Sequence, residues 1–302
     1  MKSAATLILF LLYNFASAQP DTSYNCLARW KKGEEKIILI THSVENNREG
    51  NTEPPFEISY EAHIQVTDST EEGYTLKWVF HLPQEVKKAN PLMVLAMPVY
   101  EGMQMIFKTD RNGVFKELIN WKEVKDTYLK MMMVSLPRNL DDSTKKAIEK
   151  SNEMFNSREM AESSFINEIQ LYHAPFGTFF TLNGNTFPAS FPSPFTSEPI
   201  PALVSEKLLS LSKTADHVSF NIGQDIDLDN ATSFIKGMLK KMDIPDDSLT
   251  VMTNGLLSTI RMKDHRVYQF SPSTGWLKKL VFQKTAVTDQ FNKKESFVFE
   301  MK

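Results

Sequence analysis

The segment 56–67 alternates strictly between apolar and polar residues, and this pattern constrains the fold more than any other feature of the chain. Its apolar set is Phe56, Ile58, Tyr60, Ala62, Ile64 and Val66. A period of two residues is that of a β-strand with one buried face and one solvated face. The alternation returns at 74–82 after the turn residues 68–73, so we expect an antiparallel hairpin.

Further segments carry strand patterns of the same kind. The expected strands lie at 36–44, 103–109, 114–115, 218–222, 249–254, 256–263, 265–271, 276–288 and 295–301. Asp110–Gly113 supplies a turn between two of them, because Asn-Gly accommodates the positive φ that tight hairpin turns need. A further hairpin is expected around Asn183–Asn185.

Helical spacing appears in the middle of the chain. Asn120, with a Glu three residues later, can cap a helix that ends at Pro137. A second helical region is expected at 141–172, with a break near 156–157, and Asp229 can cap a third helix.

Strands therefore precede, interrupt and follow the helices, which predicts an α+β protein with mostly antiparallel pairing. Open sheets and a half-open β-barrel both fit, in each case packed with helices from the middle of the chain. The expected parts are a signal peptide (1–18), an N-terminal lobe with the helical middle (19–175), a Phe/Pro-rich connection (176–201) and a C-terminal α+β lobe (202–302). The same pattern is compatible with one continuous domain.

The first 18 residues have the order of a secretory signal. Lys2 precedes an apolar stretch at 4–13, and small residues follow at 16–18. Cleavage is expected after Ala18, which leaves 284 of the 302 residues. The apolar stretch is too short to span about 30 Å of hydrocarbon. We therefore expect a periplasmic or secreted protein without a transmembrane segment after signal removal.

Composition and charge exclude several classes of protein. The chain is 41% hydrophobic and 24% charged, as in soluble globular proteins. Its net charge of −3 argues against a dedicated nucleic-acid binder, so we expect no nucleic-acid partner. The single cysteine, Cys26, cannot form an internal disulfide, and we expect it buried in an alternating run. An intermolecular bridge and a reactive thiol are the alternatives.

Local motifs for catalysis and metal binding are absent from the sequence. Carboxylates alternate at 225–229 as in a calcium loop, but Asn230 stands where such a loop needs Gly and Lys236 where it needs Glu. None of the six histidines forms a close ligand pair, and nucleophile elbows and phosphate-binding glycine loops are missing. We expect no metal and no cofactor, and we favour a protein without enzymatic activity. A carboxylate pair set by the fold would escape such a search, so a hydrolase stays an alternative.

The segment 175–201 is rich in aromatic residues, with six of the 15 prolines and six of the 21 phenylalanines. One interpretation is a connection whose aromatic side chains pack onto the core. The other is a lid or groove wall for an apolar ligand, because long irregular loops are often functional. The candidate ligand-binding residues are Phe176, Phe179, Phe180, Phe187 and Trp276.

The C-terminal segment Arg261–Lys302 carries nine basic residues against four acidic ones. Solvated outer strand faces and lysines that protect a sheet edge account for this excess. The alternative is attraction to anionic lipid headgroups or to an acidic partner.

Three motifs carry a resemblance to known proteins. Leu118–Val124, Tyr172–Gly177 and Phe270–Leu277 resemble segments of uncharacterised exported β-rich proteins of Bacteroidota-type bacteria, a group with a domain of unknown function. The hairpin at Thr274–Trp276 is also similar in architecture to the lipoprotein-carrier fold, a half-open β-barrel with helices in its mouth. The first resemblance implies export and no particular activity. The second implies binding of an apolar ligand and transfers no specific residue, because fold does not fix function.

Three functions follow as hypotheses. The first is a non-enzymatic binding protein for an apolar ligand, a lipid or a hydrophobic peptide, held between a curved sheet and helices. The second is a structural or interaction protein of the cell envelope, with a protein partner and with aromatic residues that serve only the core. The third is a hydrolase with dispersed carboxylates.

Overall fold

The computed structural model describes residues 22–48, 51–52, 54–82, 101–135, 156–191, 200–226, 261–287 and 291–302. Several predicted features lie outside the described residues: the signal peptide with its cleavage site, the strand at 249–254, the helix after Asp229 and the first part of the second helical region.

Most described strands form one twelve-stranded antiparallel sheet. In spatial order its strands are β7 (Phe115–Leu118), β6 (Gln104–Asp110), β5 (Gly73–His81), β4 (Phe56–Ser69), β2 (Glu35–Arg48), β14 (Phe291–Met301), β13 (Trp276–Val287), β12 (Arg261–Ser271), β11 (His217–Ile226), β10 (Ile200–Ser212) and β9 (Asn185–Phe191), with β3 (Asn51–Thr52) paired to β2. In the described part of the chain β7 and β9 lie at opposite ends, so the sheet does not close into a barrel. A second sheet contains only β1 (Ser23–Asn25) and β8 (Phe179–Thr181).

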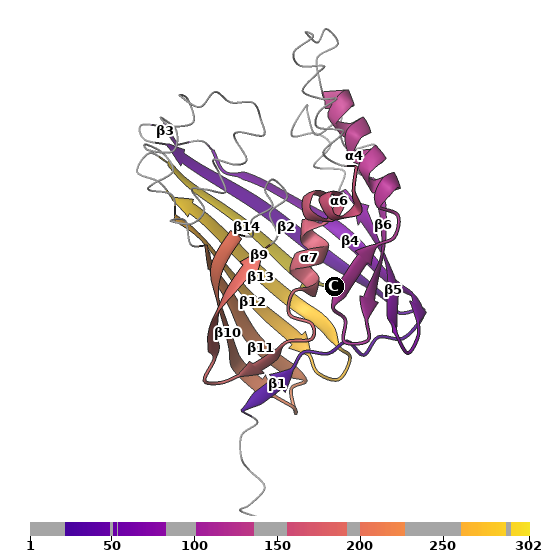
Figure 1. The fold of residues 1–302 in the computed structure, drawn as a ribbon, viewed down its shortest axis with the longest axis vertical. Coiled ribbons are helices and arrows are strands. Elements are labelled where there is room, and N and C mark those ends of the chain that lie inside the picture. The colour runs from indigo at the N-terminus through magenta and orange to yellow at the C-terminus, as the bar shows by residue number, and fades with distance from the viewer. Residues whose placement is uncertain are drawn as a thin grey trace, which may run out of the picture.

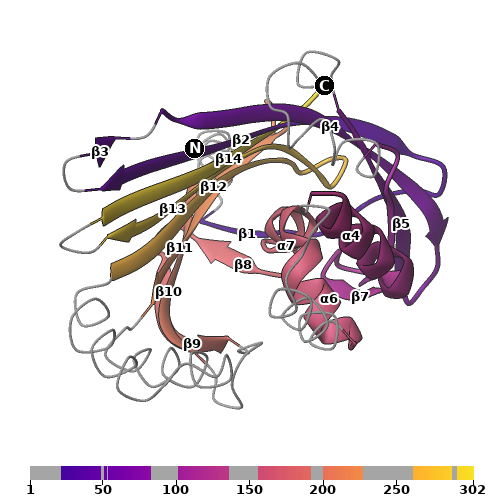
Figure 2. The same cartoon turned by 90° about the horizontal axis from the view of Figure 1, so that it is seen from above.

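The large sheet curves around the helices, which lie on its concave side (Figures 1 and 2). Among the described residues there are three helices, α4 (Trp121–Ser135), α6 (Arg158–Phe165) and α7 (Asn167–His173). The prediction of a mostly antiparallel fold is confirmed. The large share of helix that we expected is not found in the described residues, and the protein is largely β.

Strands from the two ends of the chain meet in the middle of the sheet. β2 pairs with β14 over eleven residues, which places Ile40 opposite Phe299. Both side chains are buried, in a core that also contains Trp78 from the N-terminal strands and Phe220 from the C-terminal strands. The predicted division into lobes at 176–201 stays a prediction, but the strands of both lobes share one sheet.

The hairpins with the clearest patterns form as predicted. β4 and β5 pair directly, and the apolar positions of 56–67 face the core from Ile58 onward. β6 and β7 pair around the turn at Asp110–Gly113, where Gly113 has a φ of +95°. Cys26 is a buried free thiol, which confirms that expectation.

Two strand predictions are wrong in detail. Gly184 turns the chain with a φ of +73°, but β8 pairs with β1 and β9 pairs with β10, so no hairpin forms there. Residues 256–260 lie outside the described residues, and from Arg261 onward the expected strands 256–263 and 265–271 are joined, because β12 runs unbroken through Asp264. Pairing with β11 on one side and β13 on the other holds Asp264 in the sheet.

Helix α4 begins where predicted, but Asn120 caps it differently. Its Oδ1 accepts a bond from the Ile106 amide of β6 (2.8 Å), while its Nδ2 donates to the Gln104 carbonyl (3.0 Å) and to Glu123 Oε2 (3.1 Å). Asn120 thus ties the helix start to a strand. The predicted break near 156–157 corresponds to the start of α6, where the Ser157 side chain accepts a bond from the Met160 amide.

Replacing Asn120 by alanine is expected to lower the free energy of unfolding by about 1–3 kcal/mol, because the Ile106 amide then loses its partner. Urea titration with a fluorescence readout measures the change. Asn120→Asp keeps an acceptor oxygen and is expected to lose less. Equal losses in the two variants would show that the acceptor is not what matters.

Within the described residues, no helix is both long enough and apolar enough to cross a membrane.

Candidate functional site

The five aromatic residues predicted to bind a ligand fall into two groups. Phe176, Phe180 and Trp276 are 3%, 0% and 1% exposed, whereas Phe179 and Phe187 are 54% and 39% exposed. The structure therefore does not bring the five together on one accessible surface. Their contact with a ligand stays a prediction.

Two of the buried group, Phe176 and Trp276, belong to the aromatic core around Trp30, whereas Phe180 stacks on Phe220 with centroids 4.1 Å apart. The Trp30 ring lies 5.1 Å from Phe176 and 5.0 Å from Trp276, measured between centroids, and its Nε1 donates to the Gly275 carbonyl at 2.7 Å. Trp276 Nε1 donates to Glu34 Oε2 at 2.7 Å. Trp30 thus contacts both Phe176 and Trp276, and these contacts hold the start of β13 against the N-terminal segment.

The side chains on the concave face of the sheet change from apolar to partly charged along the strands. Its deepest row is apolar and buried, and consists of Leu208, Phe220, Tyr268, Leu280, Phe299 and Ile40, each paired with the next across neighbouring strands. Tyr268 donates its hydroxyl to the Leu171 carbonyl of α7 at 3.1 Å, so this row lies against the helix.

Charged side chains occur in the next two rows along the same strands. One row consists of Glu206, Ile222, Arg266, Phe282, Phe297 and His42, and the other of Val204, Gln224, Asp264, Lys284, Glu295 and Val44. We call these two rows the inner wall. The first row mixes apolar and charged side chains, and the second is polar between Val204 and Val44, so the inner wall presents both kinds of surface.

Arg266 is the centre of one polar group on the inner wall. Its Nη2 donates to Asp264 Oδ2 at 2.7 Å and to Gln224 Oε1 at 3.2 Å, and its guanidinium carbon lies 5.8 Å from the centroid of the Phe282 ring. Nε of Arg266 and Oδ1 of Asp264 are buried without a hydrogen-bond partner. Only about a sixth of the Arg266 side chain is exposed, so this ion pair is largely withdrawn from water.

A second polar group lies where α7 approaches the inner wall. His42 stacks on Phe297 with centroids 4.1 Å apart, and its Nε2 lies 2.9 Å from Glu295 Oε1. The hydrogen bond with His42 lowers the pKa of Glu295. Across from it, Tyr60 donates its hydroxyl to Glu168 Oε1 at 2.8 Å, and burial raises the pKa of Glu168.

A hydrolase needs two carboxyl groups that face a substrate across a cleft. The pKa values of Glu168 and Glu295 are displaced in opposite directions, but each carboxylate is held by a neighbouring ring. Neither hollow bounded by described residues includes either group. The hydrolase hypothesis stays untested.

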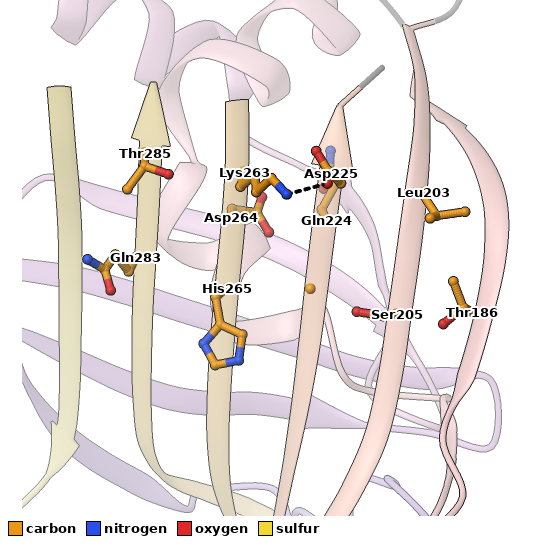
Figure 3. A pocket seen from close by; sticks show the side chains of 11 residues that line it. Thr186, Leu203, Ser205, Gln224, Asp225, Lys263, Asp264, His265, Gln283 and Thr285 are labelled. Carbon is orange, nitrogen blue, oxygen red and sulfur yellow. Dashed lines mark ion pairs between the residues drawn. The ribbon is translucent and has the colours of Figure 1, made fainter. Parts of the chain in front are cut away.

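On the opposite, outer face of the same strands lies a hollow of about 540 Å³ (Figure 3). Its residues come from β9 to β13, and the side chains on this face are mostly polar: Thr186, Leu203, Ser205, Asp225, Lys263, His265, Gln283 and Thr285. Gln224 and Asp264 also border the hollow, although their side chains bind Arg266 of the inner wall. Gly223 forms part of its floor, because a Cβ there would lie 2.6 Å from Ser205 Oγ. We call this site the outer hollow.

The outer hollow can supply hydrogen bonds from its polar side chains, although carbon atoms make up most of the surface that lines it. Lys263 Nζ and Asp225 Oδ2 form an ion pair at 2.7 Å, which cancels the charge at one end (Figure 3). Leu203, 51% exposed, is its one large apolar side chain.

The residues of the inner wall were missed by reasoning from sequence. The sequence predicts the basic excess of the last third on outer strand faces, which is correct for Lys263 and Lys279 and wrong for Arg266 and Lys284. Lys279 forms an ion pair with Glu300 on the outer face at 2.6 Å, whereas Arg266 lies on the same face of β12 as buried Tyr268. The signal was available, because alternation along β12 places residues 264, 266 and 268 together.

In the described part of the chain, no group of three or more His, Cys, Asp or Glu residues stands in an arrangement that could hold a metal ion. Asp225 of the calcium-like motif is paired with Lys263, and the rest of that motif lies outside the described residues.

No known protein family matches the chain, and no curated protein matches it. Solved structures give broader matches. Lipovitellin, in a study of its lipid–protein interactions, matches 91% of this chain with a TM-score of 0.43 and 10% identity, and the chain spans a quarter of the lipovitellin chain.

Two further matches are bacterial. A protein assigned as exported, with a YmcC-like fold, from Bacteroides fragilis has a TM-score of 0.25 and 8% identity, over 92% of this chain and all of that one. A domain assigned to outer membrane lipoprotein sorting from Vibrio parahaemolyticus has a TM-score of 0.17 and 7% identity, over 86% and 83% of the two chains. The resemblance to exported proteins of Bacteroidota-type bacteria stays a prediction. All three TM-scores are below 0.5, so the function must be argued from this chain's own geometry.

Proposed function

We propose that this is an exported, non-enzymatic binding protein whose inner wall holds a ligand with an apolar body and a polar end. The observation that carries the proposal is the inner wall itself, where aromatic and charged side chains lie next to one another on the concave face. Ligand sites in proteins are typically concave and apolar with a few well-placed polar groups.

The apolar part of the inner wall provides the driving force. Phe282 and Phe297 are neighbours across β13 and β14 but are only 5% and 3% exposed, so the accessible apolar surface on this side comes from Phe56 and Phe187, each 39% exposed. Each CH₂ group of an acyl chain that leaves water against such a surface contributes about 0.8 kcal/mol. A lipid or a hydrophobic peptide therefore fits this face.

The polar side chains of the inner wall bind the polar end of the ligand. Arg266 and Asp264 bind each other, so an oriented ion pair faces the interior without a large net charge. His42 and Glu295 form a second, hydrogen-bonded pair on the same wall. Low exposure strengthens the attraction between these charges and polar groups of a ligand.

Of the five aromatic residues predicted from the sequence, Phe187 is the one that we place in direct contact with the ligand. It lies opposite Val204, a residue of the inner wall, and is still partly exposed. Phe179 is exposed on the small sheet, where it can border the site. Phe176, Phe180 and Trp276 support the site from within the core.

A matched pair of variants tests the proposal. Phe187 and Leu203 lie on adjacent strands near the same sheet edge, but they face the inner and the outer side respectively. We expect Phe187→Ser to weaken binding of a dansyl-labelled fatty acid about tenfold, which corresponds to about 1.4 kcal/mol. Fluorescence titration of the mature protein measures this change.

Leu203→Ser is the control and should bind the probe as the wild type does. Equal affinity in all three proteins, or a loss confined to Leu203→Ser, would overturn the proposal. Absence of probe binding by the wild type, together with a stoichiometric protein partner in cross-linked envelopes, would favour the envelope interaction hypothesis instead.

Export belongs to the same proposal and is tested separately. Native mass spectrometry of the protein purified from its own host should show a chain that begins at Gln19, together with the mass of a bound ligand. A mature protein that retains Met1 would contradict export by the proposed signal.

A further inference from the structure

We propose that the outer hollow is a binding site for an uncharged saccharide. It lies on the face of the sheet opposite the inner wall, so this site is independent of the ligand proposed there (Figure 3). Five of its residues stand in one row across five neighbouring strands, each opposite the next: Thr186, Ser205, Gly223, His265 and Gln283. We call this set the polar row.

Gly223 opens the hollow in the middle of the polar row. A Cβ at this position would lie 2.6 Å from Ser205 Oγ, so a larger residue would fill the space beside the row. The backbone does not require glycine here, because the positions with positive φ do not include Gly223. The bulge between β10 and β11 lies elsewhere, at Leu208 and Ser210. Glycine inside a strand, away from any bulge, often marks a place where a ligand approaches the backbone.

The charges around the outer hollow are already paired. Lys263 Nζ lies 2.7 Å from Asp225 Oδ2. The Asp264 carboxylate binds Arg266 of the inner wall. A charged ligand would have to compete with these ion pairs for its partner, whereas an uncharged ligand would not.

The hydrogen-bonding groups of the hollow are largely free to bind a ligand. Within the described residues, no hydrogen bond is formed by the side chains of four of its members: Thr186, Ser205, Gln283 and Thr285. Hydroxyl and amide groups both donate and accept, as the hydroxyls of a saccharide do. An acyl chain in this place would instead bury these groups without partners, which is unfavourable.

The hollow also has the surface and the size for a saccharide. Carbon atoms make up most of its lining, which suits the C–H groups on the face of a sugar ring. Its volume of about 540 Å³ lies within the range of about 300–1,000 Å³ that is usual for ligand sites. Neighbouring strands lie about 4.8 Å apart, so the polar row extends over about 19 Å. This is longer than one sugar ring, which indicates an oligosaccharide that lies across the strands.

A glycan microarray tests the class of ligand. It carries neutral oligosaccharides of glucose, mannose, galactose and N-acetylglucosamine beside acidic oligosaccharides. We expect the mature protein to bind at least one neutral glycan and to bind acidic glycans no better. Isothermal titration calorimetry with the neutral glycan of strongest signal then gives the affinity of each variant. No binding to any neutral glycan, or binding confined to acidic glycans, would overturn the proposal.

Variants of the polar row test the location of the site. Gly223→Val should abolish saccharide binding because its side chain fills the hollow, while a β-branched residue is well suited to a strand. Ser205→Ala and Gln283→Ala each remove a hydrogen-bonding group and should weaken binding about five- to tenfold. These two variants cover the case in which Gly223→Val folds poorly, which urea unfolding would reveal.

Lys279→Ala is the matched control for Gln283→Ala, because Lys279 is on the outer face of the same strand and does not line the hollow. It should bind the glycan as the wild type does. Phe187→Ser should also leave this affinity unchanged, since Phe187 faces the inner side. Equal affinity in all variants, or a loss in Lys279→Ala as large as that in Gln283→Ala, would contradict the assignment of the site.

Discussion

Replacing Trp30 by alanine is expected to lower the free energy of unfolding by about 3–5 kcal/mol, the range for removal of a buried Trp or Phe side chain. Trp30 is 2% exposed and joins segments that are far apart in the chain. Its ring contacts Tyr74 of β5, Phe176 after α7, and Trp276 of β13. The cavity would therefore open where the N-terminal strands, the helices and the C-terminal strands meet.

The backbone next to Trp30 cannot close this cavity easily. Gly275, whose carbonyl accepts the Trp30 hydrogen bond, has a φ of +71°, and a Cβ there would lie 2.3 Å from the Arg29 nitrogen. Because the backbones at Gly275 and Arg29 are already this close, they cannot move far into the cavity left by the Trp30 ring. The loss in free energy of unfolding should therefore be near the upper end of the range.

Urea unfolding followed by circular dichroism measures the effect. Trp30→Phe keeps an aromatic ring but loses the bond to Gly275, and is expected to be destabilised by less. Trp121→Ala is the control, because Trp121 is only partly buried at the start of α4. A loss in Trp121→Ala as large as that in Trp30→Ala would contradict a central role for Trp30.

Acidification is expected to destabilise the protein through His173. This residue is 3% exposed, donates from Nδ1 to the Gly113 carbonyl at 2.8 Å, and has a buried Nε2 without a partner. Burial lowers the pKa of His173 to about 4, from an ordinary value of 6.5. The folded protein thus favours the neutral imidazole, while the unfolded chain takes up a proton near pH 6.5.

The sign of the effect follows from this difference in pKa. The contribution of His173 to stability is complete above pH 6.5 and is lost as the pH falls toward 4. A shift of about 2.5 units at about 1.4 kcal/mol per unit corresponds to about 3 kcal/mol across this range. The protein should therefore unfold at clearly lower urea concentration at pH 4 than at pH 7.

His173→Gln separates this effect from other titrations, because glutamine can donate to Gly113 and does not titrate. We expect its stability to change by about 3 kcal/mol less than that of the wild type between pH 7 and pH 4. Glu168 acts in the opposite direction, since its raised pKa makes the folded state favour the protonated form, and Glu168→Gln isolates that term. Identical pH profiles of the wild type and His173→Gln would contradict the role given to His173.

The strands predicted correctly are those with unbroken alternation on one face. Residues 56–67 and 74–82 each place an apolar side chain at every second position, and both became central strands. β10 was missed because Leu208 and Leu209 stand together at a bulge in its pairing with β11, which interrupts the period of two. The turn at Gly184 was predicted correctly, but a turn does not decide which strands it joins.

The candidate site, like the strands, could be predicted from the sequence only in part. Aromatic content pointed to 175–201, yet aromatic residues are equally suited to a core and to a ligand site, and Phe176 and Phe180 are in the core. Arg266 and His42 lie on one wall because β12 and β2 belong to the same sheet, with β13 and β14 between them. The two residues are 224 positions apart in the chain, so no local sequence pattern indicates that they share a face.

The sequence by itself determined the type of element, the buried face of most strands and the antiparallel character of the sheet, because these depend on periods of two or four residues. Only the tertiary structure decided that β2 and β14 pair, that both halves of the chain share one core, and that charged side chains line the inner wall. These outcomes depend on contacts between segments distant in sequence, whose free energy comes from mutual burial and so cannot be assigned to either segment alone.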